Sequence, residues 1–561
     1  MKKTKKMFIS IVLAINIIYI VVRFFSIPIF QGLPSFILGF NLFVAELLGF
    51  LAYIAYIYVF TGKNNIKEKK LASLNGHIPT IDIFICTYNE DITVLAKTIM
   101  AAKKLDYPKS RFTVHVLDDG NRSELKELCH NFFNVNYISR EKNIYAKAGN
   151  INNALKQTSG ELFTILDADM ICKPNYLQET VGYFSDKKLA FVQTPQTYYN
   201  LDVYQYNVNK NYPNEQDFFM RYIEPARSSR NCVLHIGTNA IFRRKYVENV
   251  GLYPTNSITE DMALGLLLQA KGYNSLYINK TLVCGLGACT YNDLISQRDR
   301  WCRGNLQVLK HYKKVLFKQL NFKQKMIYLD GIFYWFSGLT KLIFILTPII
   351  YLLTGLVIVN LPPKFLFPLF LLAFTLQILL SKCILPEEIS KKYFKFFIRG
   401  EFYNTIIAPH LSFSIFKHYL GGRISGLKFN VTQKKLSIAK GHFYLKNAVP
   451  HLILLTLAII SIVVGTINLG KNLYLDSYLI NIFWVIYNIP GLLVSLKIAY
   501  QPTRDISKEN ILPNKASLND ITNFEIEKCL QNLSYSDLDT IMDTLINNIE
   551  PYKTNLITDK S

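Results

Sequence analysis

Long apolar runs alternate with one long polar block along this chain. Residues 7–22 and 35–60 are almost wholly apolar, and four similar runs follow at 342–360, 365–385, 449–469 and 478–499. A helix needs about 20 residues, each rising about 1.5 Å, to cross about 30 Å of hydrocarbon. Six runs near this length are too many to bury in one core, so we predict six membrane-spanning helices. The lysines before the first run would also suit a signal peptide, but no small-residue cleavage site follows it.

The polar block at 71–301 shows short β-type runs separated by helical patterns. The strands are expected at 81–86, 112–117, 162–166 and 189–193, with helices at 93–104 and 150–157. This alternation predicts an α/β fold with a parallel sheet and crossover helices. Ligands bind such sheets beyond the carboxyl ends of the strands, so the residues that follow each strand are the first functional candidates.

Polar clusters follow three of these strands. They are Thr87, Tyr88 and Glu90 after the first, Asp119 after the second, and Asp167 and Asp169 after the third. Two carboxylates in one turn can hold Mg²⁺ together with substrate phosphates. Acidic residues are also common in turns for structural reasons. The convergence of three clusters on one edge, rather than any single one, indicates a cation-dependent site.

Three further motifs follow, two at expected helix starts and the third immediately before a basic, amphipathic stretch. They are 147–150 (KAGN) with Lys147, 259–261 (TED) with Thr259, Glu260 and Asp261, and 297–301 (QRDRW) with Gln297, Arg300 and Trp301. A lysine beside backbone N–H groups suits a phosphate, a carboxylate suits a general base, and Arg-Trp suits a diphosphate and a sugar ring. The structural alternatives are helix capping by Asn150 and Thr259 and an interfacial tryptophan anchor.

Composition and charge narrow the class of protein. The 561 residues are 50% hydrophobic and only 18% charged, which excludes disorder and an ordinary water-soluble enzyme. The formal charge is +23, of which +17 lies in 302–447 beside the apolar runs and only +2 in the polar block. This distribution favours membrane lipids as anionic partners and argues against nucleic acid. The nine cysteines include no CxxC pair, so a zinc site is not expected.

Basic residues also predict the topology. Lysines precede the first run and follow the second, whereas the loop 26–34 has none. We therefore expect both termini and the polar block to be cytoplasmic. The expected divisions are two spans at 1–70, a catalytic domain at 71–305, interfacial helices, two spans and a gating loop at 306–447, two spans at 448–500, and an acidic tail at 501–561.

The series D, D, D, QxxRW, made by Asp119, the Asp167–Asp169 pair, Asp261 and residues 297–301, resembles the processive family 2 glycosyltransferases, specifically the bacterial cellulose synthase catalytic subunits. The similarity covers roughly 80–500. It extends to Phe429, Val431 and Thr432, which fit the FxVT gating loop of that family. One departure is 235–239 (HIGTN), where the family usually has a Phe-Cys-Gly-Ser type turn against the acceptor sugar. Only 61 residues follow the last run, so we expect no C-terminal PilZ domain of about 100 residues.

The resemblance implies a fold and an activity. The fold would be a GT-A-type, Rossmann-like cytoplasmic domain inserted in a six-helix membrane domain. The activity would be inverting transfer of glucose from UDP-glucose to a growing β-glucan, most simply β-1,4-linked cellulose, with export across the plasma membrane. A mixed-linkage or β-1,3-glucan, a type 37-like capsular glucan and hyaluronan remain open as products. A polymer transporter or a non-catalytic scaffold would need the spans but not the nucleotide-site motifs.

The resemblance also implies roles for individual residues. Asp261 would be the general base within the catalytic Thr259-Glu260-Asp261, and Mg²⁺ or Mn²⁺ would bind Asp167 and Asp169. The acceptor and channel residues would be Gly237, Thr238, Trp301 and Trp335. The remaining UDP-sugar contacts would come from Thr87, Tyr88, Glu90, Asp119, Lys147, Gln297, Arg300 and the gating loop. The implied partners are UDP-glucose, the glucan chain, membrane lipids and an accessory subunit.

Overall fold

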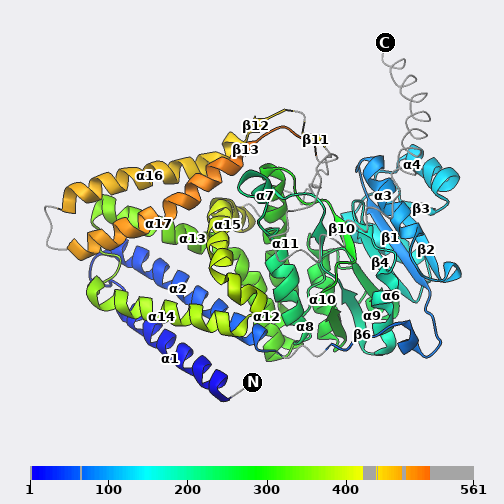
Figure 1. The fold of residues 1–561 in the computed structure, drawn as a ribbon, viewed down its shortest axis with the longest axis horizontal. Helices are drawn as coiled ribbons and strands as arrows, with labels where there is room; N and C mark the ends of the chain where they lie inside the picture. Colours follow the sequence, from blue (N-terminus) through cyan, green and yellow to red (C-terminus); the bar gives the residue numbers. More distant parts are fainter. Residues whose placement is uncertain (1–2, 63–65, 421–436, 439, 470–474, 506–561) are drawn as a thin grey trace, which may run out of the picture.

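The computed structural model describes residues 3–62, 66–420, 437–438, 440–469 and 475–505. Phe429, Val431 and Thr432 of the expected gating loop lie outside these residues. Long apolar helices form one side of the molecule and an α/β body the other, with α11 (Tyr291–Lys318), α12 (Phe322–Phe333) and α15 (Glu387–Leu420) between them (Figure 1).

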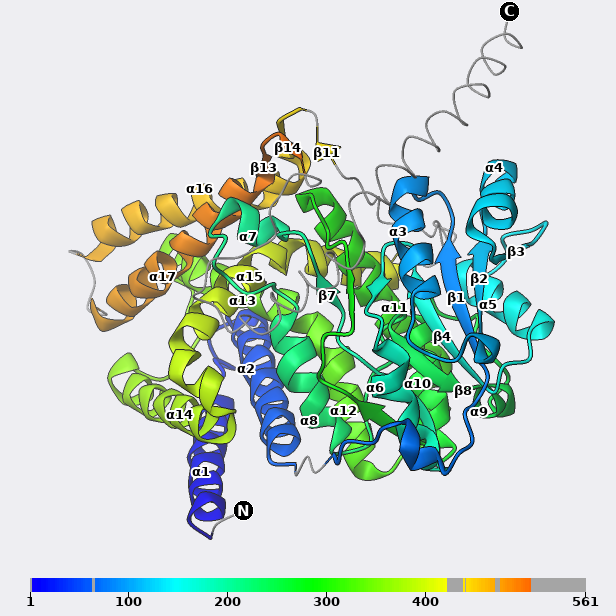
Figure 2. The same cartoon turned by 45° about the vertical axis from the view of Figure 1, so that its right-hand side comes forward.

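A seven-stranded sheet forms the α/β body, in the order β3-β2-β1-β4-β8-β6-β9. Its strands are β1 (Ile81–Thr87), β2 (Phe112–Asp118), β3 (Asn136–Ser139), β4 (Leu162–Asp167), β6 (Leu189–Gln193), β8 (Ala240–Arg243) and β9 (Asn274–Tyr277). Strands β1 to β4 are mutually parallel, so their carboxyl ends share one edge, as predicted (Figure 2).

The four expected strands β1, β2, β4 and β6 are mutually parallel, but β8, which was not expected, lies between β4 and β6 and runs antiparallel to both. The chain reverses before β8 through Gly237 and Asn239, which have φ values of +88° and +57°. These left-handed conformations allow the tight turn that reverses the chain.

Alternate residues of each strand pack under helices on opposite faces of the sheet. Ile81, Ile83 and Ile85 of β1 pack with α3, whereas Phe84 and Cys86 pack with α5. Four stacked or tilted phenylalanines cross β1, β4, β8 and β6 on the second face, with ring centroids 5.2–5.6 Å apart. The covering helices are α3 (Ile92–Lys103), α4 (Ser123–Glu127), α5 (Ala146–Gln157), α6 (Tyr176–Val181), α9 (Arg244–Asn249) and α10 (Glu260–Ala270).

Smaller elements complete the body and its junction with the membrane helices. Two short helices, α7 (Val203–Asn207) and α8 (Glu224–Ser228), lie toward the junction in Figure 1. A three-stranded sheet joins β5 (Ile171–Cys172), β10 (Val283–Gly285) and β7 (Thr197–Tyr198). Two-stranded pairings join β11 (Ser437–Ile438) to β14 (Arg504–Asp505) and β12 (His442–Phe443) to β13 (Tyr500–Gln501).

All six expected spans appear as helices long and apolar enough to cross a membrane. They comprise α1 (Lys3–Phe25), α2 (Leu33–Phe60), α12 continuing into α13 (Ser337–Thr354), α14 (Pro363–Ile384), α16 (Leu445–Leu469) and α17 (Leu475–Ala499). The third was expected to reach residue 360, but α13 ends at Thr354 because Gly355 adopts a left-handed φ of +72° and caps it.

Candidate active site

The ends of β1, β2 and β4 bring the predicted polar clusters together. In the sheet register Thr87 pairs with Asp118, and Cys86 pairs with Asp167. The Asp119 backbone N–H also donates a 3.0 Å hydrogen bond to the Thr87 carbonyl. Since parallel strands end at one edge, residues 80 positions apart in sequence become neighbours here.

The first cluster is tied together by a single arginine. Arg122 donates to the Thr87 hydroxyl at 2.8 Å and to the Glu90 carbonyl at 2.8 Å, and it forms an ion pair with Asp118 at 3.1 Å. The Glu90 carboxylate accepts the Thr87 hydroxyl and the Tyr88 N–H, at 2.8 and 2.7 Å. The predicted residues Thr87, Tyr88 and Glu90 therefore share one hydrogen-bonded turn, in which Tyr88 is 40% exposed.

Asp119 is held by a second arginine that the motif analysis missed. Arg140 donates to both carboxylate oxygens, at 2.6 and 2.8 Å, and its guanidinium also donates to the Ile144 and Ala146 carbonyls. Burial raises the pKa of Asp119, and the Arg140 guanidinium opposes this rise. A carboxylate has about four lone-pair sites, so Asp119 retains acceptor capacity beyond this bidentate pair.

Lys147 connects the end of β4 to the turn before β8. It lies in the first turn of α5, where its ammonium group pairs with the Asp167 carboxylate and donates to the Gly237 carbonyl at 2.8 Å. Thr238 forms a second link between the same two segments, because its hydroxyl accepts the Asp167 backbone N–H at 3.1 Å. Asn150 does not cap the helix: it lies inside α5, and its side chain donates to the Leu117 carbonyl at 3.0 Å.

Asp167 and Asp169 are placed as a pair of oxygen donors after β4. Asp169 is buried, and one of its carboxylate oxygens accepts the Leu286 N–H at 2.7 Å, which fixes the side chain. The Asp167 side chain is 36% exposed and faces Lys147. Across the described ranges no group of three or more His, Cys, Asp or Glu side chains could hold a metal alone. Two hard carboxylates nevertheless fit a Mg²⁺-type ion that takes its other ligands from phosphates and water.

The TED motif forms the start of α10. Thr259 occupies the N-cap position, but its side chain makes no capping bond and instead meets the Ser257 hydroxyl at 3.1 Å. Asp261 lies against the turn before β8: a Cβ built on Gly237 would be 2.9 Å from the Asp261 carboxylate. The main chain of the turn therefore approaches Asp261 more closely than any residue with a side chain would allow.

Glu260 and Asp261 have strongly perturbed acidities. Burial, reinforced by the neighbouring Asp261 charge, raises the pKa of Glu260 to about 7. Burial also raises the pKa of Asp261, against the lowering effects of the Met262 N–H, Lys147 and Arg300. A carboxylate whose pKa lies nearer neutrality is a better proton acceptor at physiological pH.

The turn 235–239, where the sequence departs from the family pattern, is held by its own network of hydrogen bonds. The buried His235 ring contacts the Gln193 side-chain oxygen at 3.2 Å and the Tyr253 hydroxyl at 3.1 Å. Gln193 also donates to the Thr238 carbonyl at 2.8 Å. Burial and the Lys147 charge hold the pKa of His235 well below its usual range. Neutral His235 thus fixes the turn that carries Gly237 and Thr238.

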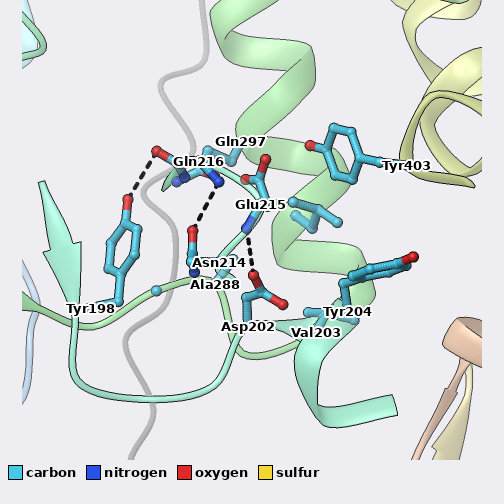
Figure 3. Close-up of a pocket in the computed structure, with 12 residues that line it drawn as sticks. Tyr198, Asp202, Val203, Tyr204, Asn214, Glu215, Gln216, Ala288, Gln297 and Tyr403 are labelled. Atoms are coloured by element: carbon cyan, nitrogen blue, oxygen red, sulfur yellow. Dashed lines mark hydrogen bonds between the residues drawn. The ribbon is translucent and has the colours of Figure 1, made fainter. Parts of the chain in front are cut away.

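The QRDRW residues lie on α11. Gln297 is buried and lines a narrow hollow of about 10 Å³, with Tyr198, Glu215, Gln216 and Tyr403 around it (Figure 3). That volume admits about one water molecule and no sugar. Glu215 pairs with Arg298, whose guanidinium lies 4.5 Å from the Trp301 ring centroid. The structure brings Arg300 close enough to Glu260 and Asp261 to lower their pKa values.

Trp335 lies apart from the catalytic cluster. It sits in the short 3₁₀ turn between α12 and α13 and is only 7% exposed. Its apolar cluster also contains residues of α10, α11 and α15, and Trp301 packs against that cluster. The two tryptophans therefore belong to one continuous apolar cluster between α11 and the membrane helices.

Comparison with known proteins places this geometry in a family. The family model "Glycosyl transferase family 2" matches residues 82–251, and the model "Cellulose synthase" matches 245–490. The cellulose synthase catalytic subunit (UDP-forming) of Pseudomonas fluorescens is 33% identical over 416 residues, which cover 73% of this chain and 55% of that protein. The chain is a cellulose synthase-like member of glycosyltransferase family 2.

Other relatives agree with the assignment of this cellulose synthase-like chain. The catalytic subunit of Xanthomonas axonopodis pv. citri is 30% identical, over 85% of this chain and 65% of that protein. The chain thus spans about half to two thirds of the length of these curated relatives. Among solved structures, the mannosyltransferase PcManGT from Pyrobaculum calidifontis in complex with GDP-Man and Mn²⁺ covers 68% of this chain at 15% identity and a TM-score of 0.44, a likeness too low to carry an inference.

Family membership confirms the expected GT-A-like fold and the multi-pass membrane architecture of this cellulose synthase-like chain. The roles of the individual site residues and the domain divisions remain predictions. Helix α11 runs through the expected boundary at 305 without ending there.

Proposed function

We propose that this protein polymerises glucose from UDP-glucose into a β-1,4-glucan and moves the chain across the membrane. One observation carries the proposal: Asp261, with a raised pKa, lies against the Gly237 main chain, and Lys147 links that same turn to Asp167. A proton acceptor and a nucleotide-sugar site thus share a single turn. The relatives in Pseudomonas and Xanthomonas, named as UDP-forming cellulose synthases, support this reading.

The proposed donor site is the edge formed by β1, β2 and β4. Thr87, Tyr88, Glu90 and Asp119 hold the uracil end, and Lys147 and Arg300 lie near the diphosphate. Asp167 and Asp169 would hold Mg²⁺ or Mn²⁺, which when bound offsets negative charge on the diphosphate. Phe429, Val431 and Thr432 would close over the nucleotide.

The proposed reaction is a direct displacement with inversion. The Asp261 carboxylate takes the proton from the acceptor hydroxyl as that oxygen forms a bond to C1 of glucose. The bond from C1 to the UDP oxygen breaks on the opposite face, so an α-linked donor gives a β-linkage. Thr238, Gln297 and Trp301 position the terminal sugar, and the product then passes Trp335. The hollow at Gln297 is too small for a sugar, so the proposed acceptor position lies outside it, beside Asp261 and Trp301.

The purified full-length chain, incubated with labelled UDP-glucose and Mg²⁺, tests the proposal. We expect UDP release together with a labelled polymer that a β-1,4-specific glucanase digests. Incubation with other UDP-sugars in parallel assigns the donor. A polymer that resists the glucanase would assign another linkage, and the absence of UDP release would reject glycosyl transfer altogether.

We also propose a plasma-membrane location with the catalytic domain in the cytoplasm, and association with an accessory subunit. The lysine-free loop 26–34 supports this orientation. In intact cells a Gln31→Cys variant should react with an impermeant maleimide, and a Lys126→Cys variant should not. The reverse labelling pattern would invert the topology.

A further inference from the structure

A second cleft lies at the opposite edge of the main sheet from the candidate active site. It has a volume of about 720 Å³ and is bordered by Leu189 and Asn274, at the amino ends of β6 and β9. Strands β1, β2 and β4 present their carboxyl ends to the active site, and β6 runs parallel to β4 through its antiparallel pairing with β8. The cleft is therefore separate from the nucleotide site, and its size is typical of pockets that bind small ligands.

The walls of this cleft are fixed by close packing. A Cβ built on Gly62, just beyond the end of α2, would lie 2.0 Å from the Ser229 hydroxyl, so a larger residue there would displace the Ser229 side chain. Arg230 stacks 4.0 Å from the Tyr58 ring centroid and donates to the Tyr58 carbonyl at 2.8 Å. On the far side Gln324 of α12 donates to the Asn231 carbonyl at 3.1 Å. Two span-forming segments and the α/β body thus enclose the cleft together.

The cleft carries an excess of positive charge. Its lining includes Lys67, Lys69, Arg230 and Lys323, against a single acid, Asp186. Both Asp186 oxygens are already used, by the Lys188 N–H at 2.8 Å and the Asn274 amide at 3.2 Å. Within the part of the chain that the structure describes, none of the four cations forms an ion pair with a carboxylate.

The position of these cations indicates the chemistry of the ligand. The cleft lies beside the end of α2 and the start of α12, where Phe322 is 72% exposed and Ile66 is 37% exposed. Basic residues next to the ends of membrane spans attract phosphates at the membrane surface. We propose that this cleft binds the phosphate group of an anionic ligand, carried either by a phospholipid headgroup or by a soluble phosphate compound. This inference does not rest on glycosyl transfer.

Binding of defined probes to the purified full-length chain tests the inference. In native mass spectrometry the protein is titrated with phosphatidylglycerol, with phosphatidylcholine of the same acyl chains, and with inorganic phosphate as a competitor. Inorganic phosphate alone is titrated separately. The cleft variant is Lys67→Gln with Lys323→Gln, and the matched control is Lys156→Gln with Lys245→Gln, two exposed lysines outside the cleft. All four substituted side chains are exposed, and thermal unfolding of each variant checks that its fold is kept.

We expect phosphatidylglycerol to bind wild type and control equally, and to bind the cleft variant about tenfold more weakly. If inorganic phosphate does not displace the lipid, the source is a phospholipid headgroup. If inorganic phosphate itself binds and the cleft variant loses that binding, the source is a soluble phosphate. Equal phosphatidylglycerol binding by all three proteins, with no binding of inorganic phosphate, would overturn the proposal.

Discussion

The candidate active site contains two pairs of consecutive acids that differ in their counter-charges. Asp118 and Asp119 each face an arginine, Arg122 and Arg140, at 3.1 and 2.6 Å. Among the residues that the structure describes, Glu260 and Asp261 form no ion pair, and the Asp261 carboxylate accepts the Met262 N–H at 2.7 Å. The first pair is thus held by direct ion pairs to arginine, and the second is buried without one. Burial raises the pKa of Asp119 despite Arg140, as it raises those of Glu260 and Asp261, but only Glu260 is raised to about 7.

The largest effect should come from removing the proposed base. Asp261→Asn should lower the rate of polymer synthesis by about 10²–10⁴-fold, the usual range for a general base. UDP binding, measured by calorimetry, should stay within about twofold of wild type, because the amide keeps the side-chain shape. Glu248→Gln, an exposed acid on α9, is the matched control. Synthesis at the wild-type rate would remove Asp261 as the base.

A smaller effect should follow from a side chain at the turn beside the base. Gly237→Ala places a methyl group 2.9 Å from the Asp261 carboxylate at a φ of +88°, so the turn or Asp261 must move. We expect synthesis to fall by about 10–100-fold, because small displacements of reacting groups have effects of that size. Gly251→Ala has a similar φ of +89° but open space around it, and it controls for backbone strain. Equal losses in both variants would show that strain alone, and not the approach to Asp261, matters.

Removing the arginine that holds Asp119 should weaken UDP binding and leave the rate of synthesis at saturating substrate nearly unchanged. Arg140→Gln leaves Asp119 buried without its bidentate partner, so we expect the Kd for UDP to rise by about tenfold. The rate at saturating UDP-glucose should change little. Lys156→Gln removes one positive charge from α5 without touching Asp119, and it should leave the Kd unchanged. A fall in the saturated rate without a change in Kd would reverse the roles assigned to the two pairs.

The last expected effect is a change in how the free energy of unfolding depends on pH. The pKa of Glu260 is about 7 in the folded protein, against an ordinary value of 4.5 when exposed. Between these values the folded state binds more protons than the unfolded state, so wild type loses stability as pH rises through this window. Glu260→Gln cannot ionise. Its free energy of unfolding relative to wild type should therefore increase by about 2 kcal/mol from about pH 5 to about pH 7.5. Thermal unfolding at the two pH values measures this, and parallel shifts of the two proteins would contradict it.

The sequence was sufficient to find Asp119 but not the arginines that hold it and its neighbour Asp118. Arg140 directly follows β3, on the same sheet edge as Thr87 and Asp119. Because β3 (Asn136–Ser139) has four residues and only one buried side chain, no apolar run marked it as a strand. A rule that includes every residue after a short polar strand would have found this arginine. The sequence does not identify Arg122 as a partner, because its contacts depend on the conformation of the turn after β2.

The sequence locates Glu260 and Asp261, but it does not reveal their raised pKa values or the approach of Gly237. TED predicts a helix start, and α10 begins at Glu260 as expected. The raised pKa values, however, depend on burial by segments distant in the chain, and the approach of Gly237 depends on the antiparallel β8. Neither effect has a local signature, since both arise only when the turn at 235–239 and α10 meet.

The direction of β8 has a consequence for how such an enzyme could change its product. In the proposed function, the residues that end strands β1, β2 and β4 hold the nucleotide, and the turn that precedes the antiparallel β8 holds the acceptor. Residues 235–239 can therefore diverge while the donor-binding strand ends stay as they are, with Lys147 as the direct link between the two halves. Under the proposed function, substitutions confined to this five-residue turn would therefore alter the acceptor side of the site, whereas the strand ends that hold the sugar nucleotide would keep their sequence.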